Sequence, residues 1–147
     1  MSRSTETPKQ RIKQGDIYLV NLPKQKLKGG LRHGGREMCG PHRCLVLQDE
    51  SITKKINQVI VIPISSAKEK SERATWVRIP AGSTEGVPKH SYIMCEQIRS
   101  LDKRRLKGKV GELSIVYMIG VQKILDFMCP SVLDVDVSEK KGAGVKP

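Results

Sequence analysis

The sequence predicts a mainly β protein with a C-terminal helix, and three observations lead to this class. The chain has 147 residues, a length typical of one domain. Short apolar runs rich in β-branched residues recur between glycines, prolines and polar turns. The last apolar segment changes to the three-and-four spacing of a helix. Short strands followed by one helix point to a small barrel or a curved sheet.

Each expected strand is a short apolar run. The five runs are residues 17–22, 43–48, 58–65, 75–79 and 91–95. Pro63 lies near the end of the third run and is expected at a sheet edge or a bulge, because proline cannot donate to a ladder. Trp76 is expected in the core. Residues 100–102 are expected to form a turn, and a short apolar piece follows at residues 109–111.

The expected helix begins after Ser114, a residue type favoured at the N-cap. From residue 115 to residue 128, apolar side chains follow helical spacing, and Pro130 just beyond suits the end of the helix. The folded domain is therefore expected over residues 14–130. Residues 1–13 form a polar, basic tail, and residues 131–147 form an extension that we expect to be disordered at its end.

Residues 23–42 form a long polar stretch that is rich in glycine and basic residues. Loops longer than about 12–15 residues are uncommon unless they are functional or disordered. We therefore expect this loop to bind a negatively charged partner through its charges.

The net charge is +12, from 27 basic and 15 acidic residues. A charge of this size on a small surface favours a polyanion as partner, such as nucleic acid, an anionic membrane or an acidic protein. The basic residues concentrate in two stretches, which are Lys24, Lys26, Lys28, Arg32, Arg36 and Arg43, and then Arg99, Lys103, Arg104, Arg105, Lys107 and Lys109. No apolar run reaches the roughly 18–20 residues that span a bilayer, so we expect no membrane insertion and a cytoplasmic location.

The four cysteines are consistent with reduced thiols in the cytosol. Cys39, His42 and Cys44 lie close together, with His33 nearby, and invite a zinc interpretation. The spacing lacks the second cysteine pair that closes a tetrahedral site, so we expect neither a metal nor another cofactor.

Four segments, taken in order, resemble the MazF/PemK family of toxins. They are residues 15–22 (GDIYLVNL), 42–47 (HRCLVL), 59–66 (VIVIPISS) and 96–102 (EQIRSLD), and the likeness spans roughly residues 13–129. The sequence departs from the family at Cys44, where proline is usual. It also departs at Met94, where some relatives carry a catalytic arginine.

The resemblance implies an SH3-like small β-barrel that forms a homodimer and binds an acidic antitoxin. It also implies sequence-selective, metal-independent cleavage of single-stranded RNA. In this reaction the 2′-hydroxyl attacks the adjacent phosphate and leaves a 2′,3′-cyclic phosphate and a 5′-hydroxyl. DNA lacks this nucleophile.

Four catalytic residues follow from the resemblance. Arg43 is expected to hold the scissile phosphate as its charge grows, and Ser65 is expected to donate to a phosphate oxygen. His42 is a candidate for proton transfer, because its ordinary pKa suits either direction. Glu96 is expected to act as a general base or to hold Arg43. Expected RNA-binding residues are Gln97, Arg99, Lys28, Arg36 and Ser66.

Two other functions compete with this interpretation. One is a non-catalytic nucleic-acid-binding barrel, because basic patches also serve binding without cleavage. The other is a toxin of the same fold that poisons DNA gyrase. Intact RNA after incubation without metal favours the first, and gyrase inhibition without RNA cleavage favours the second.

Overall fold

The computed structural model describes residues 11–24, 38–66 and 72–132. The strands are β1 (Asp16–Leu22), β2 (Gly40–Val46), β3 (Gln58–Ser66), β4 (Trp76–Ile79), β5 (Ser91–Met94), β6 (Arg99–Asp102) and β7 (Leu106–Glu112). A short helix, α1 (Glu50–Thr53), precedes β3, and the long helix α2 (Ile115–Met128) follows β7. Two 3-10 turns, η2 (Cys95–Gln97) and η3 (Lys103–Arg105), flank β6.

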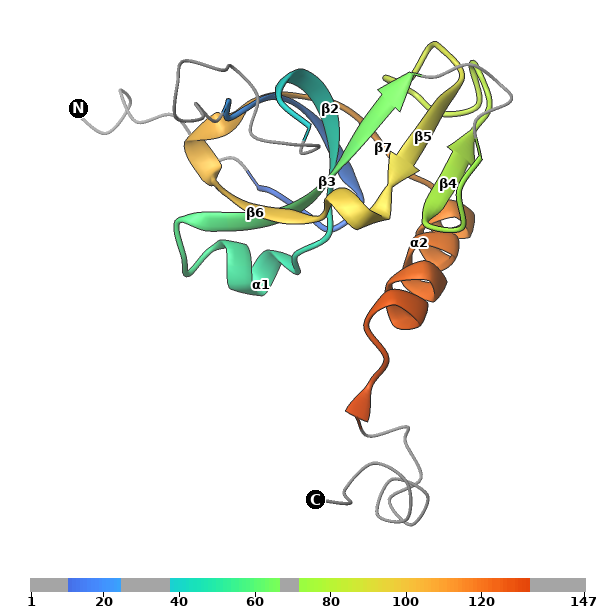
Figure 1. Ribbon diagram of the computed structural model, residues 1–147. Coiled ribbons are helices and arrows are strands. Elements are labelled where there is room, and N and C mark those ends of the chain that lie inside the picture. The colour runs from blue at the N-terminus through green and yellow to red at the C-terminus, as the bar shows by residue number, and fades with distance from the viewer. Residues whose placement is uncertain (1–10, 25–37, 67–71, 133–147) are drawn as a thin grey trace, which may run out of the picture.

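The strands form one antiparallel sheet in the order β4-β5-β3-β2-β1-β7, and β6 also pairs with β3 (Figure 1). One edge of β3 pairs with β2, while the other edge pairs first with β6 and then with β5. Pro63 lies on β3 between the last residue paired with β6, Val61, and the first paired with β5, Ile64. Its missing N–H therefore falls where β3 changes partners, rather than at an edge of the sheet.

Strands β6, β3, β2, β1 and β7 curve into a barrel-like half, and β4, β5 and α2 lie on the other side of the molecule (Figure 1). The ladder of hydrogen bonds leaves β6 and β7 unpaired with each other, so the barrel is not closed. The expected mainly β fold with a C-terminal helix is confirmed.

Alternating side chains of the central strands enter two separate cores. On β3, Val59 and Val61 join one core with Tyr18, whereas Ile62 and Ile64 join the other with Ile17. Both faces of the central sheet are thus covered. This explains why the segments around β2 and β3 have continuous apolar runs instead of simple alternation.

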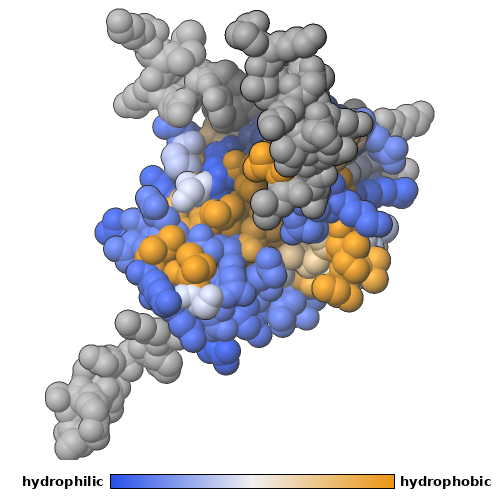
Figure 2. All heavy atoms as spheres, turned by 90° about the horizontal axis from the view of Figure 1, so that it is seen from below, coloured by the Kyte–Doolittle hydropathy of each residue, from blue (hydrophilic) through white to orange (hydrophobic). Residues whose placement is uncertain are grey.

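Helix α2 packs one face against the core that contains Ile62. Val121 is buried there, and Tyr117, Met118, Ile124, Leu125 and Met128 pack beside it. The opposite face carries exposed hydrophobic residues, which are Ile115, Val116, Ile119 and Phe127. Figure 2 shows hydrophobic patches within a largely hydrophilic surface on the side toward which α1 and α2 project. Monomers rarely expose large apolar patches, so this face is a candidate for covering by a partner.

Two glycines allow the loop before β5 to touch β7. A Cβ added to Gly86 would lie 2.5 Å from the Val110 carbonyl oxygen, and a Cβ added to Gly111 would overlap the Glu85 carbonyl oxygen. Gly86 also has a φ of +83°, a conformation that L side chains rarely adopt. The close approach brings the loop that carries Pro88 and Lys89 against the sheet.

Several local expectations are corrected. Residues 100–102 belong to strand β6 instead of a turn, because they pair with β3. The apolar piece at residues 109–111 is part of the longer strand β7. Trp76 is half-buried and outside the core, since its indole N–H donates to Glu96. Ser114 occupies the N-cap position, although its side chain makes no capping hydrogen bond.

The predicted tail and extension lie mostly outside the described residues. Of the tail, residues 11–13 contact the domain, since Arg11 pairs with Glu50 and Ile12 packs against the core that contains Tyr18. No helix among the described residues is long and apolar enough to cross a membrane.

Candidate active site

The register of β2 on β3 brings two of the predicted catalytic residues together. Arg43 pairs with Ile64, so Ser65 is the next residue along the neighbouring strand. Both line a cavity of about 340 Å³. Its lining residues are Pro41, His42, Arg43, Ile64, Ser65, Ser66, Pro88, Lys89 and Ser91. The cavity thus combines residues of β2, β3 and the loop that leads into β5.

Arg43 is half-buried, and its Nε is buried without a hydrogen-bond partner among the described residues. None of the ion pairs in that part of the chain includes Arg43. Buried donors are nearly always paired, and an unpaired donor on a charged group is costly. Arg43 is therefore arranged to receive an acceptor from outside, and an anion is the best match.

Two serines at the end of β3 add neutral donors to the cavity. The Ser65 hydroxyl donates to the Ser66 carbonyl oxygen at 3.3 Å, which is long for a hydroxyl hydrogen bond. A hydroxyl rotates to suit its acceptor, so Ser65 can exchange this weak hydrogen bond for one to a bound ligand. Ser66 is exposed at the mouth of the same cavity.

His42 lies beside Arg43 and lines the same cavity. Burial lowers the pKa of His42 below its ordinary value, and the charge of Arg99 lowers it further. Hydrogen bonds between the ring and the backbone of Cys39 and Ile64 act in the opposite direction. His42 is consequently neutral near pH 7, and a neutral ring has one donor and one acceptor nitrogen.

Gln97 and Arg99 hold the chain just before β2 in place. The Arg99 Nη1 donates to the Met38 carbonyl oxygen at 2.9 Å, and the Met38 N–H donates to the Gln97 Oε1 at 3.1 Å. The Arg99 Nη2 donates to the same Gln97 oxygen at 2.9 Å. Gln97 and Arg99, both predicted to bind RNA, thus form a closed ring of hydrogen bonds with the backbone of Met38.

Glu96 takes different partners from the expected Arg43. Its Oε1 accepts from the Thr75 hydroxyl at 2.8 Å, and its Oε2 accepts from the Trp76 indole N–H at 2.9 Å. The physical reason is the turn η2, which brings Glu96 beside β4. Glu96 thereby joins β4 to η2, and it is not among the residues that line the Arg43 cavity.

The remaining predicted residues give less information. Lys28 and Arg36 lie outside the described residues. Lys89, which the sequence analysis did not single out, lines the cavity with Arg43. Its position after Pro88 in a loop carries no local signal of this role, since only the fold brings it to β2 and β3.

A metal centre does not explain this cluster. Within the described ranges, no group of three or more His, Cys, Asp or Glu residues is placed to hold a metal ion. Burial raises the pKa of the Cys44 thiol to about 12. Metal binding needs the thiolate, so Cys44 is better suited to the core, where it packs.

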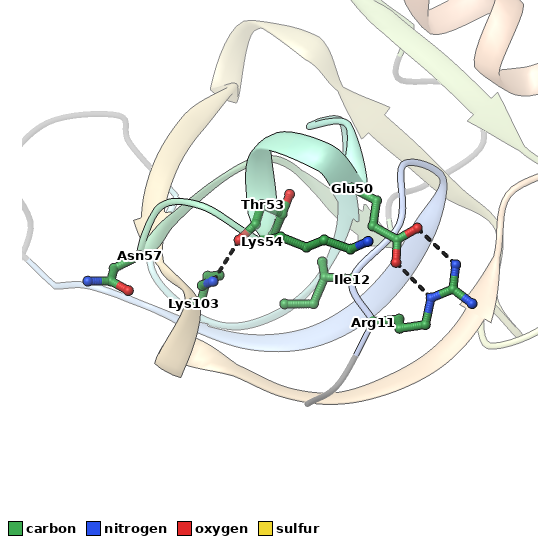
Figure 3. A pocket seen from close by; sticks show the side chains of 7 residues that line it. All are labelled: Arg11, Ile12, Glu50, Thr53, Lys54, Asn57 and Lys103. Carbon is green, nitrogen blue, oxygen red and sulfur yellow. Dashed lines mark hydrogen bonds and ion pairs between the residues drawn. The ribbon is translucent and has the colours of Figure 1, made fainter. Parts of the chain in front are cut away.

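A larger cavity of about 680 Å³ lies elsewhere, near α1 (Figure 3). It is lined by Arg11, Ile12, Glu50, Thr53, Lys54, Asn57 and Lys103. Three of its charged groups have internal partners. Arg11 forms two hydrogen bonds with Glu50, at 2.7 and 3.1 Å, and Lys103 donates to the Thr53 carbonyl oxygen at 2.6 Å. We therefore take the smaller Arg43 cavity as the candidate active site, on the basis of its chemistry.

Known proteins match both the sequence and the fold. Endoribonuclease MazF of Staphylococcus epidermidis is 35% identical over 115 residues, which cover 78% of this chain and 88% of the relative. The endoribonuclease MazF of Staphylococcus saprophyticus subsp. saprophyticus is 32% identical over the same shares.

Solved structures establish the fold. MazF from Deinococcus radiodurans in its Form-I crystal has a TM-score of 0.67 at 20% identity, covering 83% of this chain and 99% of that one. An endoribonuclease in complex with its cognate antitoxin, from a mycobacterial species, has a TM-score of 0.60 at 16% identity, covering 82% and 98%. Residues 13–129 match the family described as the PemK-like, MazF-like toxin of type II toxin-antitoxin system. With this match and these relatives, the chain belongs to the PemK/MazF toxin family.

Proposed function

We propose that this chain is the toxin of a type II toxin-antitoxin system and an endoribonuclease that cleaves single-stranded RNA at the Arg43 cavity without a metal. One observation carries the proposal: the Nε of Arg43 is buried without a hydrogen-bond partner among the described residues, in a cavity that Arg43 shares with Ser65. The family and the curated relatives named endoribonuclease MazF support the activity. RNA as substrate also implies action in the cytoplasm.

The proposed reaction is the one that the family resemblance implies. The 2′-oxygen forms a bond to the adjacent phosphorus while the bond from phosphorus to the 5′-oxygen breaks. The 2′-hydroxyl gives up one proton, and the departing 5′-oxygen gains one. The products are a 2′,3′-cyclic phosphate and a 5′-hydroxyl, and no metal is required if the protein manages both protons.

Arg43 has the central role in this proposal. Negative charge grows on the non-bridging phosphate oxygens, and a guanidinium held in a partly buried site stabilises that charge without further reorganisation. The Ser65 hydroxyl adds a neutral donor to one of these oxygens. His42, neutral near pH 7 and lining the same cavity, takes part in one of the two proton transfers.

Glu96, Gln97 and Arg99 serve the site indirectly in this proposal. Glu96 fixes η2 against β4 through Thr75 and Trp76, and the other two fix Met38 ahead of β2. Ser66 remains a candidate RNA contact at the cavity mouth, and Lys28 and Arg36 remain candidate contacts from the long loop.

Two protein partners are part of the proposal. The solved mycobacterial endoribonuclease is in complex with its cognate antitoxin, and MazF of Deinococcus radiodurans is solved together with MazE. An acidic antitoxin suits a chain of charge +12. The exposed apolar face of α2, which includes Ile115 and Phe127, supports burial against a second copy in a homodimer.

The test is cleavage of an unstructured RNA by the purified protein in buffer with EDTA, with sequencing of the cut ends. We expect cyclic phosphate and 5′-hydroxyl ends. Arg43→Ala should lower kcat by roughly 10²–10³-fold, the usual effect of removing one transition-state donor. Arg78→Ala, which removes an exposed arginine of β4, is the matched control.

Three results would overturn the proposal. Full activity of Arg43→Ala removes the residue from the mechanism. Intact RNA together with inhibition of DNA gyrase transfers the chain to the other toxin activity, and intact RNA with tight binding makes it a binding protein.

A further inference from the structure

Of the six basic residues from position 99 to position 109, two have no ion pair or short hydrogen bond with the residues that the structure describes. Arg99 holds Met38, Lys103 donates to the Thr53 carbonyl oxygen, Arg104 pairs with Asp102 at 2.9 Å, and Lys109 pairs with the buried Asp16 at 3.2 Å. Arg105 makes one long contact, at 3.4 Å, with the Asn21 carbonyl oxygen. Lys107 is exposed and takes part in none of the ion pairs found in the described ranges.

Lys107 occupies an irregularity in the pairing of β1 with β7. Leu19 pairs with Gly108 and Val20 pairs with Leu106, so Lys107 is an extra residue between two consecutive pairs. Such β-bulges redirect a side chain and are common next to active sites. Here Lys107, at the bulge, lines a second cavity together with residues of β2.

That cavity, of about 320 Å³, adjoins the Arg43 cavity. It is lined by Leu19, Val20, Asn21, Pro41, His42, Arg43 and Lys107. Pro41, His42 and Arg43 line both cavities, so the two are neighbours at the start of β2. A chain bound at Arg43 therefore has a direct path to Lys107.

The second cavity has two chemically different parts. Leu19 exposes 42% of its surface although it lies in a strand next to the core, and Pro41 is also exposed. Lys107 stands at the same cavity with an ammonium group. An apolar surface beside a cation matches one nucleotide, whose base has flat apolar faces and whose phosphate is an anion.

The path from Arg43 to Lys107 extends into a third cavity. A third cavity, of about 380 Å³, is lined by Asn21, Asp102, Arg104, Arg105 and Lys107, and so shares Asn21 and Lys107 with the second. Arg105 is exposed there. The three cavities in sequence place the cations of Arg43, Lys107 and Arg105 along one path, as an extended polyanion requires.

We propose that the cavity between Arg43 and Lys107 is a nucleotide subsite for the RNA strand. Leu19 and Pro41 contact the base of a nucleotide next to the cleaved bond, and Lys107 binds its phosphate. Arg105 continues the path for the following phosphate. This inference rests on the proposed function, because Arg43 is taken to hold the scissile phosphate.

The test measures binding and cleavage of one RNA oligonucleotide that contains a mapped cut site. For binding, a 2′-deoxy nucleotide at the cut removes the nucleophile, and affinity is measured over a series of KCl concentrations. Lys107→Gln should weaken binding about tenfold, as expected for a lost contact with a charged group. It should also make the slope of log K against log salt shallower by about 0.7, the value for one phosphate of a single strand.

Leu19→Ala gives a different signature. It removes apolar contact and no charge, so affinity should fall severalfold while the salt slope stays as in the wild type.

In cleavage assays, Lys107→Gln should change KM more than kcat. Lys55→Ala removes an exposed lysine outside the three cavities and serves as the control for charge alone.

The outcomes separate the subsite from the activity. If the wild type cleaves and Arg43→Ala does not, but Lys107→Gln binds with wild-type affinity and slope, the subsite is overturned and the ribonuclease stands. If no RNA is cleaved, binding is measured with an unmodified, unstructured oligonucleotide; should Lys107→Gln and Leu19→Ala then change binding as stated, the subsite stands and the ribonuclease fails. The last measurement is the binding of a polyglutamate peptide to Lys107→Gln. If this variant binds RNA as the wild type does but binds the peptide more weakly, Lys107 contacts an acidic protein and the subsite is overturned.

Discussion

Arg99 donates a hydrogen bond to the carbonyl oxygen of Met38, 61 positions earlier in the chain, at 2.9 Å. Gln97 completes the ring by accepting from both residues. Met38 lies two residues before Gly40, where β2 begins. The contact therefore joins β6 to the start of the strand that carries His42 and Arg43.

We predict that Arg99→Ala lowers kcat about tenfold, because the start of β2 loses its fixed position. Arg99→Lys should restore little activity, since an ammonium group cannot reproduce the fork of the guanidinium. The salt slope of RNA binding should stay as in the wild type, because the hydrogen bonds of Arg99 are made within the protein. A shallower slope in Arg99→Ala would instead show direct contact with a phosphate.

The glycines between the loop and β7 give a prediction about stability. Gly111→Ala should lower the free energy of unfolding by about 1–3 kcal/mol, because the added methyl group meets the Glu85 backbone and the loop must shift. Gly86→Ala should behave in the same way and adds a strained φ. Urea denaturation provides the measurement. Gly108→Ala, on the same strand with open space around it, is the control, and equal losses in all three would refute the explanation.

His42 gives a prediction about pH. Burial lowers its pKa in the folded chain, so the unfolded chain binds the proton more readily. The stabilising contribution of the neutral ring is therefore complete above about pH 6.5, the ordinary value, and is lost as the pH falls toward the folded pKa. His42→Gln should flatten this loss when urea midpoints are compared at about pH 7 and about pH 5.5.

A second group titrates outside this window. Hydrogen bonds from Arg104 lower the pKa of Asp102 to about 2, so its contribution is present above the ordinary value and declines only as the pH falls below about 4. An undiminished loss of stability between about pH 6.5 and about pH 5.5 in His42→Gln would assign the effect to other groups.

Glu96 gives a spectroscopic prediction. Trp76 is the only tryptophan in the chain, and its indole N–H donates to Glu96 at 2.9 Å. Glu96→Gln leaves one acceptor oxygen for the two donors of Trp76 and Thr75, so the emission maximum of Trp76 should shift. Stability should fall by about 1 kcal/mol. Glu72→Gln changes an exposed glutamate and should leave the emission maximum unchanged.

The elements that the sequence predicted are those with strong local patterns. The runs that became β1 and β3, and the helical spacing of α2, are each long enough for periodicity to decide. Strand β6 was missed because Leu101 is its only buried residue, and pairing with β3 makes it a strand. Helix α1 has four residues, which is too short to show a period.

For the candidate site, the sequence suggested which residues to consider but not how they are arranged in space. Arg43 and Ser65 were found through motif similarity, and their common cavity depends on a strand register that local sequence does not reveal. Glu96 and Arg99 were expected to face the substrate. Their actual partners, Trp76 and Met38, lie far away in the chain, and tertiary structure alone selects them.

The double role of β3, which supplies Val61 to one core and Ile62 to the other, has a consequence for how the protein unfolds. If one of the two cores unfolds, β3 is displaced and the other core loses part of its packing. Trp76 is next in sequence to Val77, which packs against the core that contains Ile62, and Tyr18 lies in the core that contains Val61. Emission from Trp76 and amide exchange at Tyr18 should therefore report a single transition at the same denaturant concentration.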